Sequence, residues 1–224
     1  MASMTLKKIR LGLVEDHTLY RELLAQSLEN VEEFEMVATA SSFAEARLTF
    51  PNAGLDCAIL DIELGDGNGV NLGIELRKEQ PDLGILLLSG RDMVELLLGL
   101  PTKERHGWSY LSKTSTTSLQ ILVNTIHRTI EGETVIDPVL VERSSARAGT
   151  PVASLTKRQY EILRAVALGQ SNQTIADNLN IASNSVVNHL SAIYAALNIP
   201  EGQNARVSAV LEFLHDTTRR ATNS

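Results

Sequence analysis

Several polar side chains in the first half of this 224-residue chain directly follow short apolar runs. They are the carboxylates Glu15, Asp16 and Asp61, the hydroxyl group of Ser89 and the amine of Lys113. Carboxylates held close together repel one another, and a hard cation such as Mg²⁺, which prefers oxygen ligands, relieves that repulsion. A lysine and a hydroxyl facing such an ion could hold phosphoryl oxygens. The set therefore predicts a pocket that phosphorylates one of its own carboxylates, with Asp61 as nucleophile and the adjacent Glu15 and Asp16 as metal ligands.

These side chains need a scaffold that brings distant segments together. Short apolar runs predict strands at residues 9–14, 36–40, 57–60, 84–88 and 108–111. Amphipathic patterns between and after them predict helices near residues 19–28, 43–50, 70–79, 93–100 and 118–130. Such alternation is typical of an α/β fold with a doubly wound, five-stranded parallel sheet, flavodoxin-like in arrangement. Ligand sites in this architecture gather at the carboxyl ends of the strands, where the polar residues stand.

The second half of the chain has a different organisation. The stretch 142–154 is small and polar, with Gly149 and Pro151, which is the composition of a flexible tether after a short helix at about 137–145. Four short helices are predicted beyond it. The first begins with a capping box at Thr156 and Gln159 and ends at Gly169. The others cover about 172–179, 183–197 (with Ser183 as N-cap) and 204–216, and the middle pair has helix-turn-helix geometry.

Composition and charge narrow the classes of protein. The single cysteine, Cys57, excludes a disulfide framework and a cysteine zinc site, and its place within a strand predicts a buried, inert thiol. No apolar run reaches the length of a membrane span, and residues 1–8 lack the apolar core of a signal peptide, so we expect a cytoplasmic protein without membrane contact. Residues 1–140 hold 12 Lys and Arg against 21 Asp and Glu, whereas residues 155–224 hold six against five. Two domains with different partners are indicated.

Four segments of the first half resemble the receiver domain of bacterial two-component response regulators. They are the pair Glu15-Asp16 before His17, the run ILDIELGDGNG around Asp61, the run LLSG around Ser89, and the run YLSK that ends at Lys113. The resemblance spans about 7–130 and implies phosphorylation of Asp61 by a sensor histidine kinase. It implies Mg²⁺ held by Glu15, Asp16, Asp61 and the backbone carbonyl of Glu63, and a phosphorylation state reported by Ser89 and Tyr110.

Two departures from the receiver pattern concern the region that switches. Gly65 stands where the family usually has proline after the phosphorylation site, and the interval from Ser89 to Lys113 is two residues longer than usual. The receiver accepts a phosphoryl group on its own aspartate and is not expected to be a turnover enzyme. We divide the chain into a receiver at 7–131, a linker at 132–154 and a helix-turn-helix domain at 155–217.

The second half resembles the LuxR/NarL-type DNA-binding domain over about 155–215. The resemblance rests on the runs LTKRQYEILR, GQSNQTIA and IASNSVVNHL, which begin at Leu155, Gly169 and Ile181. It implies that the helix 183–197 enters the major groove of promoter DNA and that two copies of the chain bind related half-sites. The residues expected to contact DNA are Thr174, Ser183, Asn184, Ser185, Val187, Asn188 and Ser191.

The helix predicted at 183–197, which we call the recognition helix, has no Lys or Arg from residue 184 to 197. Family members commonly carry lysine where Val187 stands. Phosphate neutralisation supplies much of DNA affinity, so binding should be weak and its salt dependence shallow. Asn188 could pair with adenine and Val187 could contact a thymine methyl, while uncharged hydroxyls bond phosphates.

We interpret the chain as a DNA-binding transcriptional response regulator, in which phosphorylation of Asp61 controls homodimerisation and promoter binding. The alternative is a receiver-based interaction and dimerisation module whose lysine-poor helix-turn-helix does not read DNA specifically. A Mg²⁺-dependent phosphohydrolase is a third possibility, and it would need Glu63 as its acid/base carboxylate.

Overall fold

The computed structural model describes residues 7–91, 106–143, 146, 148–200 and 204–217. It divides into two compact units, one built from residues up to 93 together with 107–133, and one that includes 134–224. No helix in the described residues is long and apolar enough to cross a bilayer.

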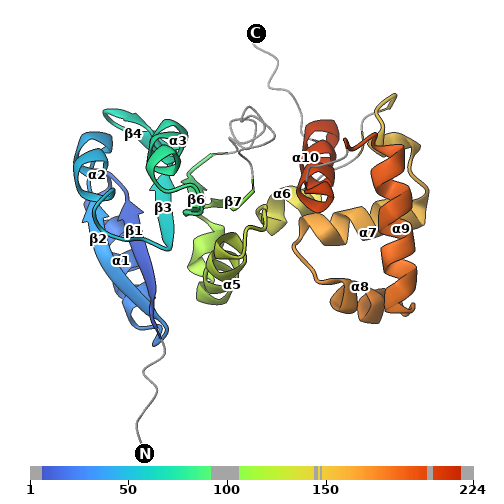
Figure 1. The fold of residues 1–224 in the computed structure, drawn as a ribbon, viewed down its shortest axis with the longest axis horizontal. Coiled ribbons are helices and arrows are strands. Elements are labelled where there is room, and N and C mark those ends of the chain that lie inside the picture. Colours follow the sequence, from blue (N-terminus) through green and yellow to red (C-terminus); the bar gives the residue numbers. More distant parts are fainter. Residues whose placement is uncertain (1–6, 92–105, 144–145, 147, 201–203, 218–224) are drawn as a thin grey trace, which may run out of the picture. The chain divides into compact units, whose positions relative to one another are not determined.

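The first unit is an α/β layer structure around a five-stranded parallel sheet, as the sequence predicts (Figure 1). The strands, in the spatial order β2-β1-β3-β6-β7, are Phe34–Ala40, Ile9–Val14, Cys57–Asp61, Gly84–Ser89 and Trp108–Ser112. All neighbours in the sheet pair in parallel. The three central strands are almost wholly buried, which is why short apolar runs revealed them.

Helices cover both faces of this sheet. The helices α1 (Thr18–Glu29) and α5 (Leu119–Ile130) contact each other on one face, and α2 (Phe43–Thr49) and α3 (Gly69–Glu79) contact each other on the other. One core cluster lies under α1 and α5, and its buried members are aliphatic apart from one phenylalanine, Phe34, and one cysteine, Cys57. This packing fixes the depth at which each strand ends, and therefore the level of the polar residues that follow.

Four features of the first unit differ from the sequence expectation or lie beyond it. Strand β2 begins at Phe34, two residues earlier than predicted, and Asp61 belongs to β3. A small antiparallel hairpin of β4 (Glu63–Leu64) and β5 (Gly67–Asn68) follows β3. A 3₁₀ turn, η2 (Ser115–Thr117), follows β7. The predicted helix at 93–100 lies outside the described residues.

The hairpin is pinned to the neighbouring helix by Asp66. Its two carboxylate oxygens accept hydrogen bonds from the backbone N–H groups of Phe43 and Ala44, at 2.8 and 3.0 Å. These are the first residues of α2, whose N–H groups have no partner inside the helix. The family usually has proline where Gly65 stands. In this protein the next residue, Asp66, anchors the hairpin to α2 through these two hydrogen bonds.

The second unit is helical. Its elements are α6 (Pro138–Arg143), η3 (Val152–Ser154), α7 (Lys157–Ala167), α8 (Asn172–Leu179), α9 (Ser183–Ala196) and α10 (Ala205–Thr217). The predicted capping box of Thr156 and Gln159 starts α7, and Gly169 follows its end with a φ of 78°. The turn η3 lies within the stretch predicted as a tether, and Val152 N–H donates to the buried Asp216 carboxylate at 3.1 Å.

Helices α8 and α9 form the helix-turn-helix (Figure 1). The turn between them begins at Asn180, which adopts the left-handed conformation with φ 53° and ψ 50°, a conformation that asparagine tolerates better than most residues. The residue that caps α9 is Ala182, and Ser183 is the first helical residue, so the sequence prediction of Ser183 as the N-cap was wrong by one position.

Candidate functional site

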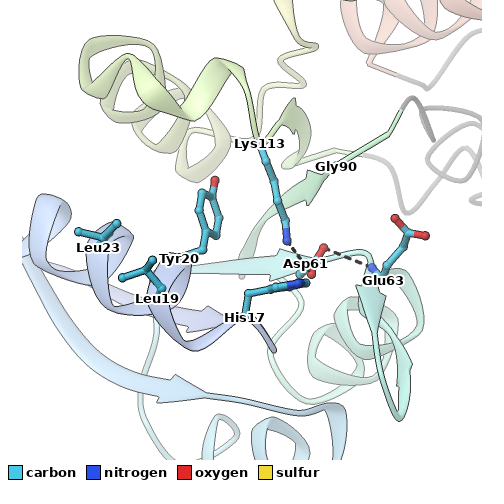
Figure 2. Close-up of a pocket in the computed structure, with 8 residues that line it drawn as sticks. All are labelled: His17, Leu19, Tyr20, Leu23, Asp61, Glu63, Gly90 and Lys113. Carbon is cyan, nitrogen blue, oxygen red and sulfur yellow. Dashed lines mark hydrogen bonds and ion pairs between the residues drawn. The ribbon is translucent and has the colours of Figure 1, made fainter.

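The predicted pocket forms at the carboxyl edge of the sheet. Glu15 follows β1, Asp61 ends β3, and Lys113 follows β7. The Lys113 ammonium lies 2.9 Å from Asp61 Oδ2 and 2.7 Å from Glu15 Oε2, and so bridges the two carboxylates. Figure 2 shows Lys113 reaching Asp61 from above. Residues 98 positions apart along the chain meet here because parallel strands deliver their ends to one edge.

Burial sets the electrostatics of this cluster. Glu15 is fully buried and Asp61 is 2% exposed. Burial raises the pKa of Asp61, the hydrogen bond from Lys113 opposes the rise, and the negative charge of Glu15 adds to it. Burial alone would lower the pKa of Lys113, but its hydrogen bonds to Glu15 and Asp61 outweigh burial and raise that pKa. The pKa of Asp61 and that of Lys113 are thus both raised, which favours a charged amine beside Asp61.

Asp16 and His17 complete the acidic side of the pocket. His17 Nδ1 lies 2.9 Å from Asp16 Oδ1 and 3.3 Å from Glu15 Oε1. The His17 side chain is mostly exposed, and the residue is the N-cap position of α1. A donor atom from each of Glu15, Asp16 and His17 lies within 4.8 Å of the others.

This donor set fits a hard divalent cation. Glu15 and Asp61 share the Lys113 ammonium, and Asp16 lies beside Glu15, so the cluster of three carboxylates keeps an excess of negative charge. Carboxylate oxygens at this density are the ligands that Mg²⁺ prefers. Glu63 lies beside them, because its backbone N–H donates to Asp61 Oδ1 at 3.3 Å (Figure 2).

Ser89 and Tyr110 both contact the backbone of Arg91. Ser89 ends β6 and is fully buried, and its Oγ accepts a hydrogen bond from Arg91 N–H at 3.2 Å. Tyr110 is also fully buried, and its hydroxyl donates to the Arg91 carbonyl at 2.7 Å. The two residues predicted to report the phosphorylation state therefore meet at one peptide segment just after the sheet.

A cavity of about 500 Å³ opens beside the carboxylates. It is lined by His17, Leu19, Tyr20, Leu23, Asp61, Glu63, Gly90 and Lys113 (Figure 2). On α1, Leu19 is 70% exposed and Leu23 is 55% exposed. The entrance to the pocket is therefore apolar on one side and charged on the other.

Sequence reasoning missed Tyr20. Its ring lies 5.1 Å from the Lys113 ammonium, close enough for a cation–π contact. Its hydroxyl bonds with Thr116 Oγ1, which in turn donates to the Lys113 carbonyl at 2.7 Å. Tyr20 thus contacts the Lys113 ammonium directly and is linked to the Lys113 carbonyl through Thr116. An aromatic residue at helical spacing gives no sequence signal beyond that of an ordinary core position.

The residues predicted to contact DNA lie on α8 and α9. Five of them are exposed: Thr174, Asn184, Val187, Asn188 and Ser191. Ser183 and Ser185 are half-buried. Val187 is not a core residue, since 46% of it is exposed, whereas Leu190 and Ile193 of the same helix are buried. The structure therefore separates a neutral outer face of α9 from its apolar inner face.

Two arginines of this unit are held by hydrogen bonds within it. Arg158 donates to the carbonyl of Leu179 at 2.8 Å and lies 3.2 Å from the Glu161 carboxylate. Arg206 donates to the side chain of Asn172 at 3.0 Å and to the carbonyl of Gln170. Both join α8 to neighbouring helices, a role that their sequence positions did not reveal.

Comparisons with known proteins find one family model in each half of the chain. The model of the response regulator receiver domain matches residues 11–127, and that of bacterial regulatory proteins of the luxR family matches residues 153–209. The nitrate/nitrite response regulator protein homolog of Haemophilus influenzae is 31% identical, covering 92% of this chain and 96% of that protein. The DNA-binding transcriptional activator DevR/DosR of Mycobacterium tuberculosis is 29% identical, covering 90% of this chain and 94% of that protein.

Solved structures show the same fold. A structure of two RcsB dimers bound to two parallel DNAs has a TM-score of 0.53 at 18% identity, covering 95% of this chain and all of that chain. A two-component response regulator of the LuxR family from Aurantimonas sp. SI85-9A1 has a TM-score of 0.50 at 22% identity, covering 57% of this chain and 88% of that chain. The chain belongs to the two-component response regulators of the NarL/LuxR type, with a receiver domain followed by a LuxR-type helix-turn-helix domain.

Proposed function

We propose that this regulator is phosphorylated on Asp61 by a sensor histidine kinase in the cytoplasm, and that phosphorylation controls its dimerisation and its binding to promoter DNA. The observation that carries the proposal is the Lys113 bridge between Asp61 and Glu15 at 2.9 and 2.7 Å. The bridge brings two buried carboxylates and a charged amine together in one pocket, which supports Asp61 as the nucleophile.

The chemistry is a phosphoryl transfer to a carboxylate. The bond between phosphorus and the kinase histidine nitrogen breaks as a bond forms between phosphorus and an Asp61 oxygen, and the imidazole leaves with the bonding electrons. Lys113 holds a carboxylate oxygen of Asp61 through a charge-assisted hydrogen bond of 2.9 Å. The raised pKa of Asp61 gives a more nucleophilic oxygen than an exposed aspartate would offer.

Mg²⁺ is the cofactor that the pocket suits. Glu15, Asp16, Asp61 and the backbone carbonyl of Glu63 would hold it, and when bound it supplies positive charge against the phosphoryl oxygens. The single charge of Lys113 neutralises only part of the negative charge of Glu15 and Asp61. The negative charge that remains in the pocket would attract the cation.

The response to phosphorylation would pass through Ser89 and Tyr110. A phosphoryl group adds about −1.5 to −2 charge and strong acceptor oxygens. The Ser89 hydroxyl, which now accepts a hydrogen bond from Arg91 N–H, would turn to donate to that group. The Arg91 segment would move with it, and Tyr110 shares that segment through its hydrogen bond to the Arg91 carbonyl. A change at Asp61 would thus reach the surface beyond β6.

The output is DNA binding through α9, whose exposed residues Asn184, Asn188 and Ser191 would face the major groove. A dimer joins two weak half-site contacts at high effective concentration. The resulting gain in affinity would offset the weak binding expected of a recognition helix without lysine or arginine. The protein acts as a phosphoryl acceptor rather than as a turnover enzyme.

The test compares the wild type with Asp61→Asn by light scattering and by binding to a promoter fragment. Both proteins are measured with and without Mg²⁺ and a small phosphoryl donor. We expect the donor to cause dimerisation and tighter DNA binding in the wild type alone. Equal dimerisation and DNA binding by both proteins would contradict control through Asp61.

The second candidate is an interaction module that dimerises without reading DNA. It is favoured by one observation, the hydrogen bonding of Arg158 and Arg206 within the helical unit, beside a helix α9 that carries no cation. It predicts that donor-dependent dimerisation survives while the phosphorylated protein binds no promoter fragment. Turnover of a small phosphate ester, abolished in Asp61→Asn, would instead support a phosphohydrolase.

A further inference from the structure

The outer face of α9 has a defined chemical character. Asn184, Val187, Asn188 and Ser191 recur at the spacing of one helix face, and all four are exposed. The opposite face, with Val186, Leu190 and Ile193, is buried. The outer face offers amides, a hydroxyl and a branched hydrocarbon group, and the whole helix contains no charged residue.

The arginines that the structure describes in this unit lie on other helices, among them Arg158 on α7 and Arg206 on α10. Arg158 and Arg206 donate to Leu179 and Gln170 carbonyls within the helical unit. Among the lysines and arginines that the structure describes between 155 and 217, only Lys157 is exposed, and it lies at the start of α7 rather than on α9. Base contacts from α9 must therefore be made by uncharged groups.

The chemistry of base edges then restricts which bases α9 can prefer. Guanine presents two acceptors in the major groove, and the residues that pair with both are the donors arginine and lysine. Adenine presents one acceptor and one donor, which the side-chain amide of asparagine matches in bidentate fashion. Thymine presents a methyl group, which an apolar side chain such as that of Val187 can cover.

We propose that α9 selects A·T base pairs at the centre of each half-site, with Asn188 pairing with adenine and Val187 covering the thymine methyl. The inference rests on the proposed function, since it requires α9 in the major groove. Adjacent helix residues rise by about 1.5 Å, less than the spacing of about 3.4 Å between base pairs. Asn188 and Val187 therefore address the same base pair or two neighbouring ones.

The first experiment selects duplexes from a random-sequence pool with the full-length protein, in the presence of Mg²⁺ and a phosphoryl donor. We expect A·T base pairs at the central positions of the enriched half-sites. Asn188→Ala should lose about 5- to 100-fold of the discrimination for adenine at one position. Asn52→Ala, which removes an exposed asparagine from the receiver unit, is the matched control and should select the same sequences as the wild type.

The second experiment replaces single thymines of the selected site by uracil, which removes only the methyl group. Loss of that contact should weaken wild-type binding roughly fourfold at the position that Val187 covers, as expected for one buried methyl. Val187→Ala should bind the thymine and uracil duplexes equally.

The outcomes separate this inference from the proposed function. Tight binding to sites with G·C at the centre, or binding unaffected by uracil at every position, would overturn the inference and leave DNA binding intact. Absence of binding to any duplex, with and without phosphorylation, would overturn both. Central A·T selection that Asn188→Ala abolishes would support both.

Discussion

A methyl group added to Gly69 would stand 2.1 Å from the backbone carbonyl oxygen of Asp61. Gly69 is the first residue of α3, and its N–H donates to the carbonyl of Ile62 at 3.1 Å. The start of α3 is thus packed directly on the strand end that carries Asp61. A side chain at this position forces either the helix or the strand end to move.

We therefore expect Gly69→Ala to lower the free energy of unfolding by about 1–3 kcal/mol, the usual cost of overpacking. Urea denaturation of the two proteins measures the difference. Gly90→Ala is the control, because a methyl group there would meet no atom within 4 Å. Equal stability of Gly69→Ala and the wild type would show that α3 can shift without cost.

Removal of Lys113 should destabilise the protein through Glu15. Glu15 is fully buried and relies on the Lys113 ammonium at 2.7 Å for its compensating charge. Lys113→Met should cost about 3 kcal/mol, because a buried charge left without its partner is strongly unfavourable. Adding Glu15→Gln to that variant should recover part of the loss. A double-mutant cycle by denaturation measures the coupling, and additive effects of the two changes would contradict it.

The two hydrogen bonds that Asp66 accepts from the start of α2, here called the Asp66 clamp, should make the free energy of unfolding depend on pH in the acid range. Hydrogen bonds from the backbone N–H groups of Ala44 and Phe43 lower the pKa of Asp66 below its ordinary value of 3.8. Because the carboxyl group has a lower pKa in the folded protein than in the unfolded chain, its ionisation stabilises the fold at pH values above 3.8. This stabilisation is lost as the pH falls from 3.8 through the pKa of Asp66 in the folded protein. The wild type should exceed Asp66→Asn in stability at neutral pH, and the difference should shrink in acid.

Denaturation of both proteins at several pH values between about 6 and 3 would show this convergence. Asp82→Asn, which changes an exposed aspartate between α3 and β6, is a suitable control of equal charge. A stability difference between Asp66→Asn and the wild type that stays constant down to the lowest pH would mean that the clamp does not depend on the carboxylate charge.

Cys57 should be inert in the folded protein. Burial, with a smaller contribution from Asp56, raises the pKa of its thiol from the ordinary value of 9.0 to about 12. Since the unfolded thiol ionises first, this group contributes its stability below pH 9.0 and loses it as the pH rises toward 12. We expect no alkylation by iodoacetamide at pH 8 without denaturant and rapid alkylation in denaturant. The alkaline loss of stability should be smaller in Cys57→Ala, and alkylation of the native protein would contradict the burial.

A lysine placed at Val187 should change the salt dependence of DNA binding. Each additional phosphate contact by a cation steepens the slope of log K against log salt by about 0.9. Val187→Lys should therefore bind all duplexes more tightly at low salt and show that steeper slope in a salt titration. Leu48→Lys adds the same charge at an exposed position on α2 of the receiver unit and should leave the slope unchanged. Equal slopes for Val187→Lys and the wild type would place residue 187 away from the phosphates.

Buried strands were the part of the fold that the sequence predicted best. Strands β3 and β6 are continuous apolar runs with every residue buried, so their positions and the polar residues at their ends could be anticipated. The hairpin of β4 and β5 escaped prediction because strands of two residues have no measurable periodicity. The N-cap of α9 was misplaced by one residue because an alanine holds the position where a serine was available next to it.

Side-chain contacts between distant segments were harder to foresee. The meeting of Lys113 with Asp61 follows from strand order alone, and the sequence predicted it. The clamp from Asp66 to α2 depends on how a hairpin folds back over 22 and 23 residues, which no local pattern encodes. The same holds for Arg206, whose partner Asn172 lies 34 positions away on another helix.

The neutral outer face of α9 also affects how a regulator searches a chromosome. Cationic faces retain proteins on arbitrary sequence and let them slide along the duplex before they reach their target. A recognition helix built from amides, hydroxyls and a valine gives little of that retention. Under the proposed function, such a regulator would reach its operator more by direct encounter than by sliding along DNA. Operator occupancy would then follow the number of assembled dimers closely, because few of them would be sequestered on competing DNA.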